Sequence, residues 1–191
     1  MNKTLPSLFA LLVLAFSWLP ATANADDFSD TIKVFKSAGE SSNYFDNAYG
    51  YAVFPTIGKA GIGIGGAYGT GRVYVGGKQV GKTKMTQLSI GLQFGGQGYS
   101  QIIFFQDERA FREFAGGNFE FGAEAGVVAI TAAANAQAST KGASAGASGG
   151  KNDASTVADG WYKGMAIFSV AKGGLMYEAS IAGQKFSYEA L

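Results

Sequence analysis

The sequence contains no cysteine and no histidine among its 191 residues. Without cysteine there is no disulfide, so an exported form of this chain depends on its hydrophobic core. The absence of both residue types excludes Ser-His-Asp and Cys-His nucleophile systems and zinc sites built from histidine or cysteine. The acidic residues are scattered, and no pair is placed to converge on a substrate. We therefore expect no enzymatic activity, no metal and no cofactor.

A strong net charge is also missing, because the chain has 15 basic and 14 acidic residues and a formal net charge of +1. Nucleic-acid-binding domains carry a marked basic excess on one face or along one helix. We therefore expect no nucleic-acid partner, and any attraction to anions has to come from a local patch.

Long hydrophobic runs are missing except near the N-terminus. There, Lys3 precedes the apolar run Leu8–Phe16, and residues 23–25 form an A-x-A cleavage site. The run is shorter than the roughly 20 apolar residues that a spanning helix needs. This pattern predicts a signal peptide over residues 1–25 and a periplasmic or otherwise exported mature chain, with a peripheral position on a membrane as one expected location.

Glycine is abundant, with 29 residues, and two glycine-rich segments match nucleotide-binding patterns. Residues 61–66 fit the dinucleotide pattern G-x-G-x-x-G, and residues 76–83 fit the phosphate-loop pattern. Both patterns bind phosphate only where the glycine loop opens a helix whose N-terminal amides face the ligand. The sequence after each segment is typical of strands and turns instead. We therefore expect no nucleotide.

From Gly50 onward the sequence has the period-two alternation of β-strands, with Pro55 ending the first strand and a tight-turn signal at residues 76–77. Other extended segments are predicted at residues 61–68, 72–75, 84–94, 99–105, 161–170, 175–181 and 185–189. The clearest alternation puts four apolar side chains on one face, namely Leu88, Ile90, Leu92 and Phe94.

Two amphipathic helices are predicted at residues 27–38 and 107–114, with a shorter helical piece at residues 43–48. The Gly/Ser/Ala-rich segment 139–158 is typical of a flexible loop. These features predict one domain, residues 26–191, of the α+β class and mainly β. We expect a curved antiparallel, barrel-like sheet with a few short helices.

No acidic residue occurs between Asp46 and Asp107, and that stretch holds the densest basic cluster of the chain. Its basic residues are Lys59, Arg72, Lys78, Lys82 and Lys84. One interpretation is a patch that binds anionic lipid headgroups, since each Lys near an anionic surface contributes roughly 1 kcal/mol. The other is a solvated hairpin whose lysines serve solubility.

The helix predicted at residues 27–38 places Phe28, Ile32 and Phe35 on one face, with Lys33 and Lys36 flanking it. This face either covers an open end of the sheet or inserts into a membrane interface while the lysines meet headgroups.

A weak internal echo relates two strand segments. Residues 50–54 with Lys59 resemble residues 164–168 with Lys172, through either a duplicated β unit or chance. Lys172 is therefore counted among the candidate lipid-binding residues.

Five runs, spread along most of the mature chain, carry a family resemblance: residues 48–69, 85–97, 102–105, 119–123 and 172–186. In this order they resemble the SYLF lipid-binding domain family. The resemblance implies a lipid-binding module that uses an N-terminal amphipathic segment and basic residues. Eukaryotic relatives bind phosphoinositides, and some bind actin, whereas a bacterial-type exported member would meet phosphatidylglycerol or cardiolipin.

The expected function is therefore an exported protein that binds a phospholipid or membrane surface through basic and aromatic groups. Binding occurs either by docking on headgroups or by holding one lipid tail inside the curved sheet. The alternatives are a small outer-membrane β-barrel and a structural envelope protein without a lipid ligand.

Overall fold

The computed structural model describes residues 24–121, 128–130, 160–172 and 183–191. Its helices are α1 (Ala25–Ser37), α2 (Gly39–Ser42), α3 (Tyr44–Asn47) and α4 (Glu108–Ala115). Its strands are β1 (Gly50–Val75), β2 (Lys78–Phe105), β3 (Phe119–Glu120), β4 (Val128–Ile130), β5 (Met165–Lys172) and β6 (Gln184–Ala190). Residues 1–23 of the predicted signal peptide, the loop 139–158 and the strand 175–181 lie outside the described residues, and Ala25, the last residue predicted for that peptide, is the first residue of α1. Within those residues, no helix combines the length and the apolar character needed to span a bilayer.

The predicted helices and the tight turn are confirmed, with small shifts at their ends. The segment predicted at 27–38 is α1, and the segment predicted at 107–114 is α4, which begins where the Asp107 carboxylate accepts a hydrogen bond from the Ala110 amide at 2.8 Å. The predicted turn joins β1 to β2, and both of its glycines have positive φ, 57° at Gly76 and 76° at Gly77. Such angles suit the two-residue hairpin turn that glycine favours.

The first hairpin is much longer than the sequence predicted. β1 has 26 residues and β2 has 28, so the short strands expected on either side of Pro55 are parts of one strand. The prediction that Pro55 ends a strand is wrong, because a register shift between Phe54 and Ile57 accommodates the proline. A bulge of this kind tolerates a residue that cannot donate to the ladder.

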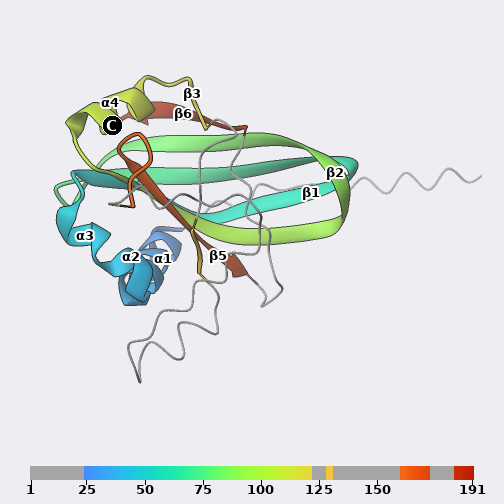
Figure 1. Cartoon of the computed structure of the whole chain (residues 1–191), viewed down its shortest axis with the longest axis horizontal. Coiled ribbons are helices and arrows are strands. Elements are labelled where there is room, and N and C mark those ends of the chain that lie inside the picture. The colour runs from blue at the N-terminus through green and yellow to red at the C-terminus, as the bar shows by residue number, and fades with distance from the viewer. Residues whose placement is uncertain (1–23, 122–127, 131–159, 173–182) are drawn as a thin grey trace, which may run out of the picture.

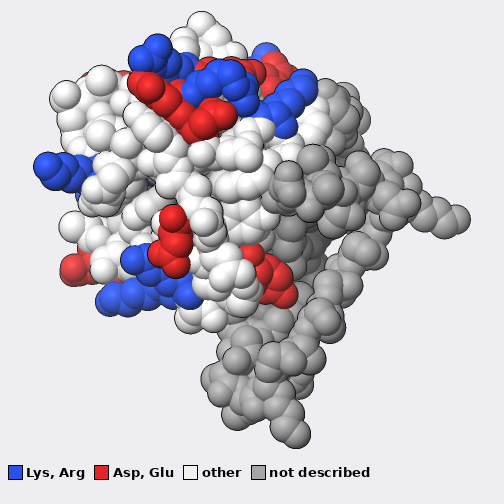
Figure 2. Space-filling model, turned by 60° about the vertical axis from the view of Figure 1, so that its left-hand side comes forward, with Lys and Arg blue, Asp and Glu red and all other residues white. Residues whose placement is uncertain are grey.

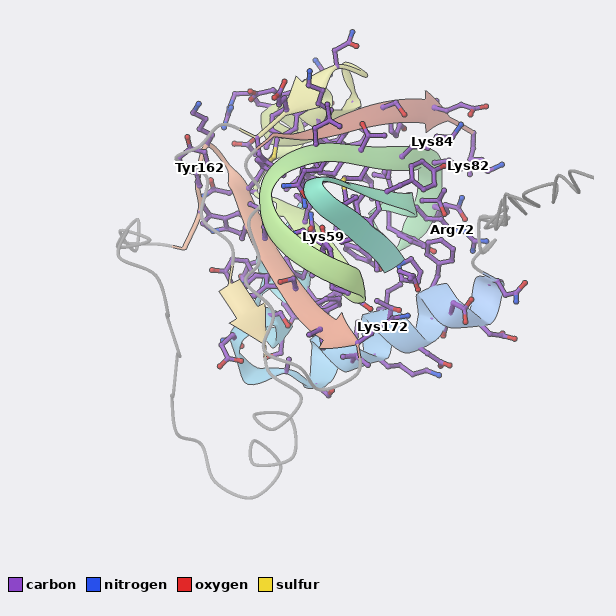
Figure 3. The ribbon with its side chains drawn as sticks, turned by 90° about the vertical axis from the view of Figure 1, so that its right-hand side faces the viewer. Lys59, Arg72, Lys82, Lys84, Tyr162 and Lys172 are labelled. Atoms are coloured by element: carbon purple, nitrogen blue, oxygen red, sulfur yellow. The ribbon has the colours of Figure 1, made fainter. Side chains whose placement is uncertain are left out.

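The six strands form one sheet in the order β3-β6-β2-β5-β4, and β1 pairs with β2 along the other edge of β2. All pairs are antiparallel except β4 with β5. The free side of β2 is shared, since its residues 81–87 pair with β6 and its residues 98–105 pair with β5. Seen end-on, the hairpin curls around itself (Figure 3), which confirms the predicted curved, mainly β architecture.

Glycine allows the curl to close. A Cβ atom on Gly71 would lie 2.7 Å from ring carbons of Phe54, and one on Gly69 would lie 2.6 Å from Cγ1 of Ile57. The side chains of Phe54 and Ile57, from the first part of β1, therefore pack directly against the backbone of its later part at these two glycines. Glycine in a strand often marks such a close approach.

Two hydrophobic clusters cover the two sides of the sheet. The inner cluster fills the concave side and includes Phe54, Ile57, Val73, Met85, Ile103, Phe105, Phe114 and Phe186. The outer cluster includes Phe28, Phe35, Val53, Ile102, Phe104 and Phe168. The helices α1, α2 and α3 lie together on one side of the hairpin, while α4, β3 and β6 lie on the other (Figure 1).

Candidate functional site

Strand pairing gathers part of the predicted basic cluster on the outer side of the sheet. Arg72 on β1 is the cross-strand partner of Lys82 on β2, and Lys84 lies two residues along on the same face. The β6 neighbour of Thr86 is Lys185, which is exposed like Lys82 and Lys84. We call Arg72, Lys82, Lys84 and Lys185 the basic face. Figure 3 shows the first three side by side on one flank of the curled hairpin.

Most of this charge has no acidic partner. Within the described part of the chain, Lys82 and Lys84 form no ion pair, although Glu189 on β6 stands opposite Lys82 in the register. Lys185 pairs with Glu120 of β3 at 3.4 Å. Within the basic face, Lys82 and Lys84 therefore keep their positive charges exposed to solvent.

The surface around α4 shows the opposite arrangement. There, Arg109 pairs with Glu113 at 3.5 Å and Arg112 pairs with Glu108 at 2.7 Å. In the upper part of Figure 2, basic and acidic side chains lie intermingled on the surface. Their charges largely cancel, so α4 offers no comparable attraction to an anion.

Two exposed apolar residues adjoin the basic face. Tyr68, the partner of Thr86, is 40% exposed, and Leu88, the partner of Gly66, is 84% exposed. The neighbouring Gln87 points inward and is only 6% exposed. The predicted alternation is therefore present at residues 87–88, but the apolar residue, Leu88, faces solvent and the polar one, Gln87, faces inward. The predicted facing of Ile90, Leu92 and Phe94 concerns side chains outside the described ones.

A pocket of about 370 Å³ opens beside the basic face. Its lining includes Tyr68, Lys84, Thr86, Asn118, Glu120 and Lys185. Three structural elements contribute: the outer side of the β1–β2 hairpin, strand β6, and the turn that carries the chain from α4 into β3. None of Tyr68, Asn118, Glu120 or Lys185 was predicted as a site residue. The pairing of β6 with both β2 and β3 joins them, and no local pattern encodes that pairing.

The other predicted basic residues lie elsewhere. Lys78 is exposed next to the hairpin turn. Lys172 donates a hydrogen bond from Nζ to Thr56 Oγ1 at 2.7 Å, and it stands two positions along β5 from Val170 of the outer cluster. Lys59 stands two positions along β1 from Ile57 of the inner cluster, so strand alternation places these two lysines on opposite sides of the sheet. Figure 3 shows both apart from the basic face.

Helix α1 packs its apolar face on the protein. Phe28 is 4% exposed and Phe35 is fully buried, and Ile32 packs partly buried against the same outer cluster. The Arg72 guanidinium lies 4.1 Å from the Phe28 ring centroid, a favourable cation–π contact. Of the two alternatives for this helix, the structure shows the covering one, although α1 covers the outer side of the sheet and not an open end. Phe28 and Phe35 are buried in this arrangement.

The two lysines of α1 are engaged locally. Lys33 Nζ lies 2.9 Å from Asp30 Oδ1, and this hydrogen bond and the carboxylate charge raise the pKa of Lys33. Lys36 lies over the Phe45 ring at 5.3 Å. Neither lysine adds to the basic face.

Side chains occupy the inside of the curl in the described part of the chain. Gln101 Nε2 donates to Gln184 Oε1 at 2.9 Å, and Gln184 Nε2 donates to Gln101 Oε1 at 3.1 Å and to the Tyr99 hydroxyl oxygen at 3.0 Å. All three side chains are almost completely buried. A lipid tail held inside the curl, the second of the two predicted binding modes, would have to displace these buried side chains.

The two nucleotide-like segments lie within strands. Residues 61–66 belong to β1, and Thr83, which would open the helix of a phosphate loop, lies within β2 with its side chain buried. Neither segment is followed by the helix N-terminus that its phosphate-binding role requires.

Comparison with known proteins identifies the family. A family model described as "Las17-binding protein actin regulator", Ysc84, matches residues 86–189, more than half of the chain. Beta cell expansion factor A of Aeromonas veronii is 31% identical over 157 residues, which cover 81% of this chain and 51% of that protein. The chain thus spans about half the length of this curated relative. As its sequence motifs predicted, the chain belongs to the Ysc84 (SYLF) family.

Proposed function

We propose that this domain binds the surface of anionic phospholipid membranes through the basic face, as an exported peripheral protein that does not act as an enzyme. Membership of the Ysc84 (SYLF) family supports a lipid- or actin-related domain. The observation that carries the membrane proposal is the exposed pair Lys82 and Lys84, which has no acidic partner within the described residues.

The arrangement of charge supports an anionic partner. Arg72 and Lys82 stand directly opposite each other, and like charges in that position destabilise a sheet. An anionic surface relieves this repulsion and contributes about 1 kcal/mol per cation close to it. Arg72, Lys82 and Lys84 together would therefore supply about 3 kcal/mol, enough for weak attachment that salt screens.

The neighbouring apolar groups support a lipid surface over a soluble polyanion. Tyr68 and Leu88 are exposed on the same face as the lysines. Tyrosine favours the interface between headgroups and acyl chains, and burial of a leucine side chain contributes about 1.5–3 kcal/mol. Insertion of Leu88 would add a component of binding that salt does not screen.

Vesicle flotation tests this function. We expect the purified chain to float with phosphatidylglycerol vesicles, to float less with them at high salt, and to stay behind with phosphatidylcholine vesicles. A structural envelope protein without a lipid ligand would show no lipid dependence. Equal absence from both kinds of vesicle at low salt would reject the proposal.

A further inference from the structure

The pocket beside the basic face is an open hollow with room for one small polar group. Its volume of about 370 Å³ lies within the range of small-molecule sites. It opens on the outer side of the sheet, where Lys84 and Tyr68 are part of its lining. A headgroup in this pocket would leave its acyl chains near the exposed Leu88, because Leu88 lies two residues along β2 from Thr86 of the lining, on the same face.

The charge of the pocket matches one negative charge. Its three charged side chains are Lys84, Lys185 and Glu120, and Lys185 is already paired with Glu120 at 3.4 Å. Lys84 is therefore the single uncompensated cation of the lining. A phosphodiester carries one negative charge, whereas a phosphomonoester carries about 1.5–2 at neutral pH. A second phosphate would meet the carboxylate of Glu120 and be repelled.

The carboxylate of Glu120 also determines which chemical group beside the phosphate the pocket prefers. An ionised carboxylate only accepts hydrogen bonds and has about four lone-pair sites, of which Lys185 uses part. Glu120 can therefore accept a further hydrogen bond from a donor group on the ligand. Lys185 already supplies a cation, so a neutral hydroxyl fits better than an ammonium group, and choline has no N–H or O–H donor at all. Thr86, Ser187 and Asn118 add exposed groups that both donate and accept.

We infer that this pocket binds a single phosphodiester headgroup that bears hydroxyl groups, of the glycerol type. Lys84 holds the phosphodiester oxygens, and Glu120 accepts a hydrogen bond from a headgroup hydroxyl. The inference rests on the proposed membrane binding and adds headgroup selectivity to it. The same chemistry occurs in a lipid headgroup and in a free glycerophosphodiester, so the test uses both.

The first experiment titrates the isotope-labelled chain with soluble glycerophosphoglycerol and follows amide NMR shifts. We expect saturable shifts at Asn118, Lys185 and Ser187, and weaker shifts with glycerophosphocholine, inorganic phosphate or inositol trisphosphate. Tighter binding of inorganic phosphate or inositol trisphosphate would overturn the charge argument. Absence of shifts at the pocket while the protein still floats with phosphatidylglycerol vesicles would overturn the inference and leave the proposed function standing.

The second experiment uses variants that keep side-chain size. Glu120→Gln should reduce the preference for glycerol over choline headgroups about tenfold, the factor expected for one charge-assisted hydrogen bond. Lys84→Gln should abolish the shifts caused by glycerophosphoglycerol. Arg112→Gln removes an exposed positive charge outside the pocket and should change neither result. An unchanged glycerol preference in Glu120→Gln would contradict the role given to this carboxylate.

Discussion

Arg72 of β1 stands directly across the hairpin from Lys82 of β2, on the outer side of the sheet, and its guanidinium also lies 4.1 Å from the Phe28 ring centroid. One arginine thus joins the basic face to helix α1. The cation–π contact stabilises Arg72, while the neighbouring Lys82 repels it. The repulsion between Arg72 and Lys82 lies on the surface that we propose binds anionic lipid, and an anionic ligand there would relieve it.

Removal of the Lys82 charge should therefore affect the stability of the fold and the binding of anionic vesicles differently. We expect Lys82→Gln to change the free energy of unfolding by less than about 1 kcal/mol, because it removes both the repulsion from Arg72 and the attraction to Glu189, which stands opposite Lys82 on β6. The same variant should bind phosphatidylglycerol vesicles several-fold more weakly, since about 1 kcal/mol of attraction disappears. Urea denaturation and flotation measure the two effects. A variant destabilised by much more than about 1 kcal/mol, with unchanged vesicle binding, would contradict both expectations.

Leu88 should govern the part of vesicle binding that resists salt. Because this side chain is 84% exposed, Leu88→Ser should leave the urea midpoint of the protein nearly unchanged. We expect the variant to float with anionic vesicles at low salt but to be lost from them at high salt, where screening leaves insertion as the main attraction. Equal retention of variant and wild type at high salt would show that Leu88 does not insert.

Closure of the curl depends on the glycines of β1. Gly71→Ala places a Cβ atom 2.7 Å from the Phe54 ring, and we expect a loss of about 1–3 kcal/mol in the free energy of unfolding from overpacking. Gly58→Ala is a matched control in the same strand, because its Cβ atom would meet nothing within 4 Å. Thermal or urea unfolding compares the two. Similar stabilities would argue against direct packing of the two halves of β1.

The buried amide pair should show strong energetic coupling. Gln101→Leu alone leaves Gln184 without its closest partner and should cost about 1–3 kcal/mol. Replacement of both glutamines by Leu removes donor and acceptor together, so its cost should be less than the sum of the two single variants. A double-mutant cycle measured by urea denaturation decides this. Simple additivity would mean that the pair does not act as a unit.

Stability should fall at alkaline pH. Burial raises the pKa of Tyr44 and Tyr188, and burial followed by the nearby Tyr74 raises the pKa of Tyr51. Above pH about 10 these tyrosines ionise in the unfolded chain before they ionise in the folded one, so the folded state loses stability as pH rises. Urea denaturation between pH 8 and 11 measures the slope, and Tyr51→Phe should make it shallower. A flat profile would contradict the burial of these rings.

The sequence predicts the elements whose determinants are local. Helices α1 and α4 follow from apolar residues at helical spacing, and the hairpin turn follows from its two adjacent glycines. The prediction that a strand ends at Pro55 is wrong, because only the register of the whole hairpin shows that a bulge accommodates this proline. Local patterns report neighbouring residues along the chain, so they predict elements better than they predict pairing.

The candidate site is less predictable for the same reason. Period-two alternation separates Gln87 from Leu88 but does not say which of them faces the core, and the structure buries the polar one. Lys185 and Glu120 enter the site because β6 pairs with both β2 and β3. Lys82 and Lys84 were predicted because they lie close in sequence. Lys59 and Lys172 were predicted as well, yet they lie apart from that face.

The most direct test of membrane binding through the basic face compares two double charge reversals by flotation with phosphatidylglycerol vesicles at low salt. Lys82→Glu with Lys84→Glu changes the basic face, and Lys33→Glu with Lys36→Glu makes the same change of charge on α1. We predict that the first protein stays behind and the second floats like the wild type, with circular dichroism showing both to be folded. Flotation of the first and loss of the second would contradict the account and assign the membrane contact to α1.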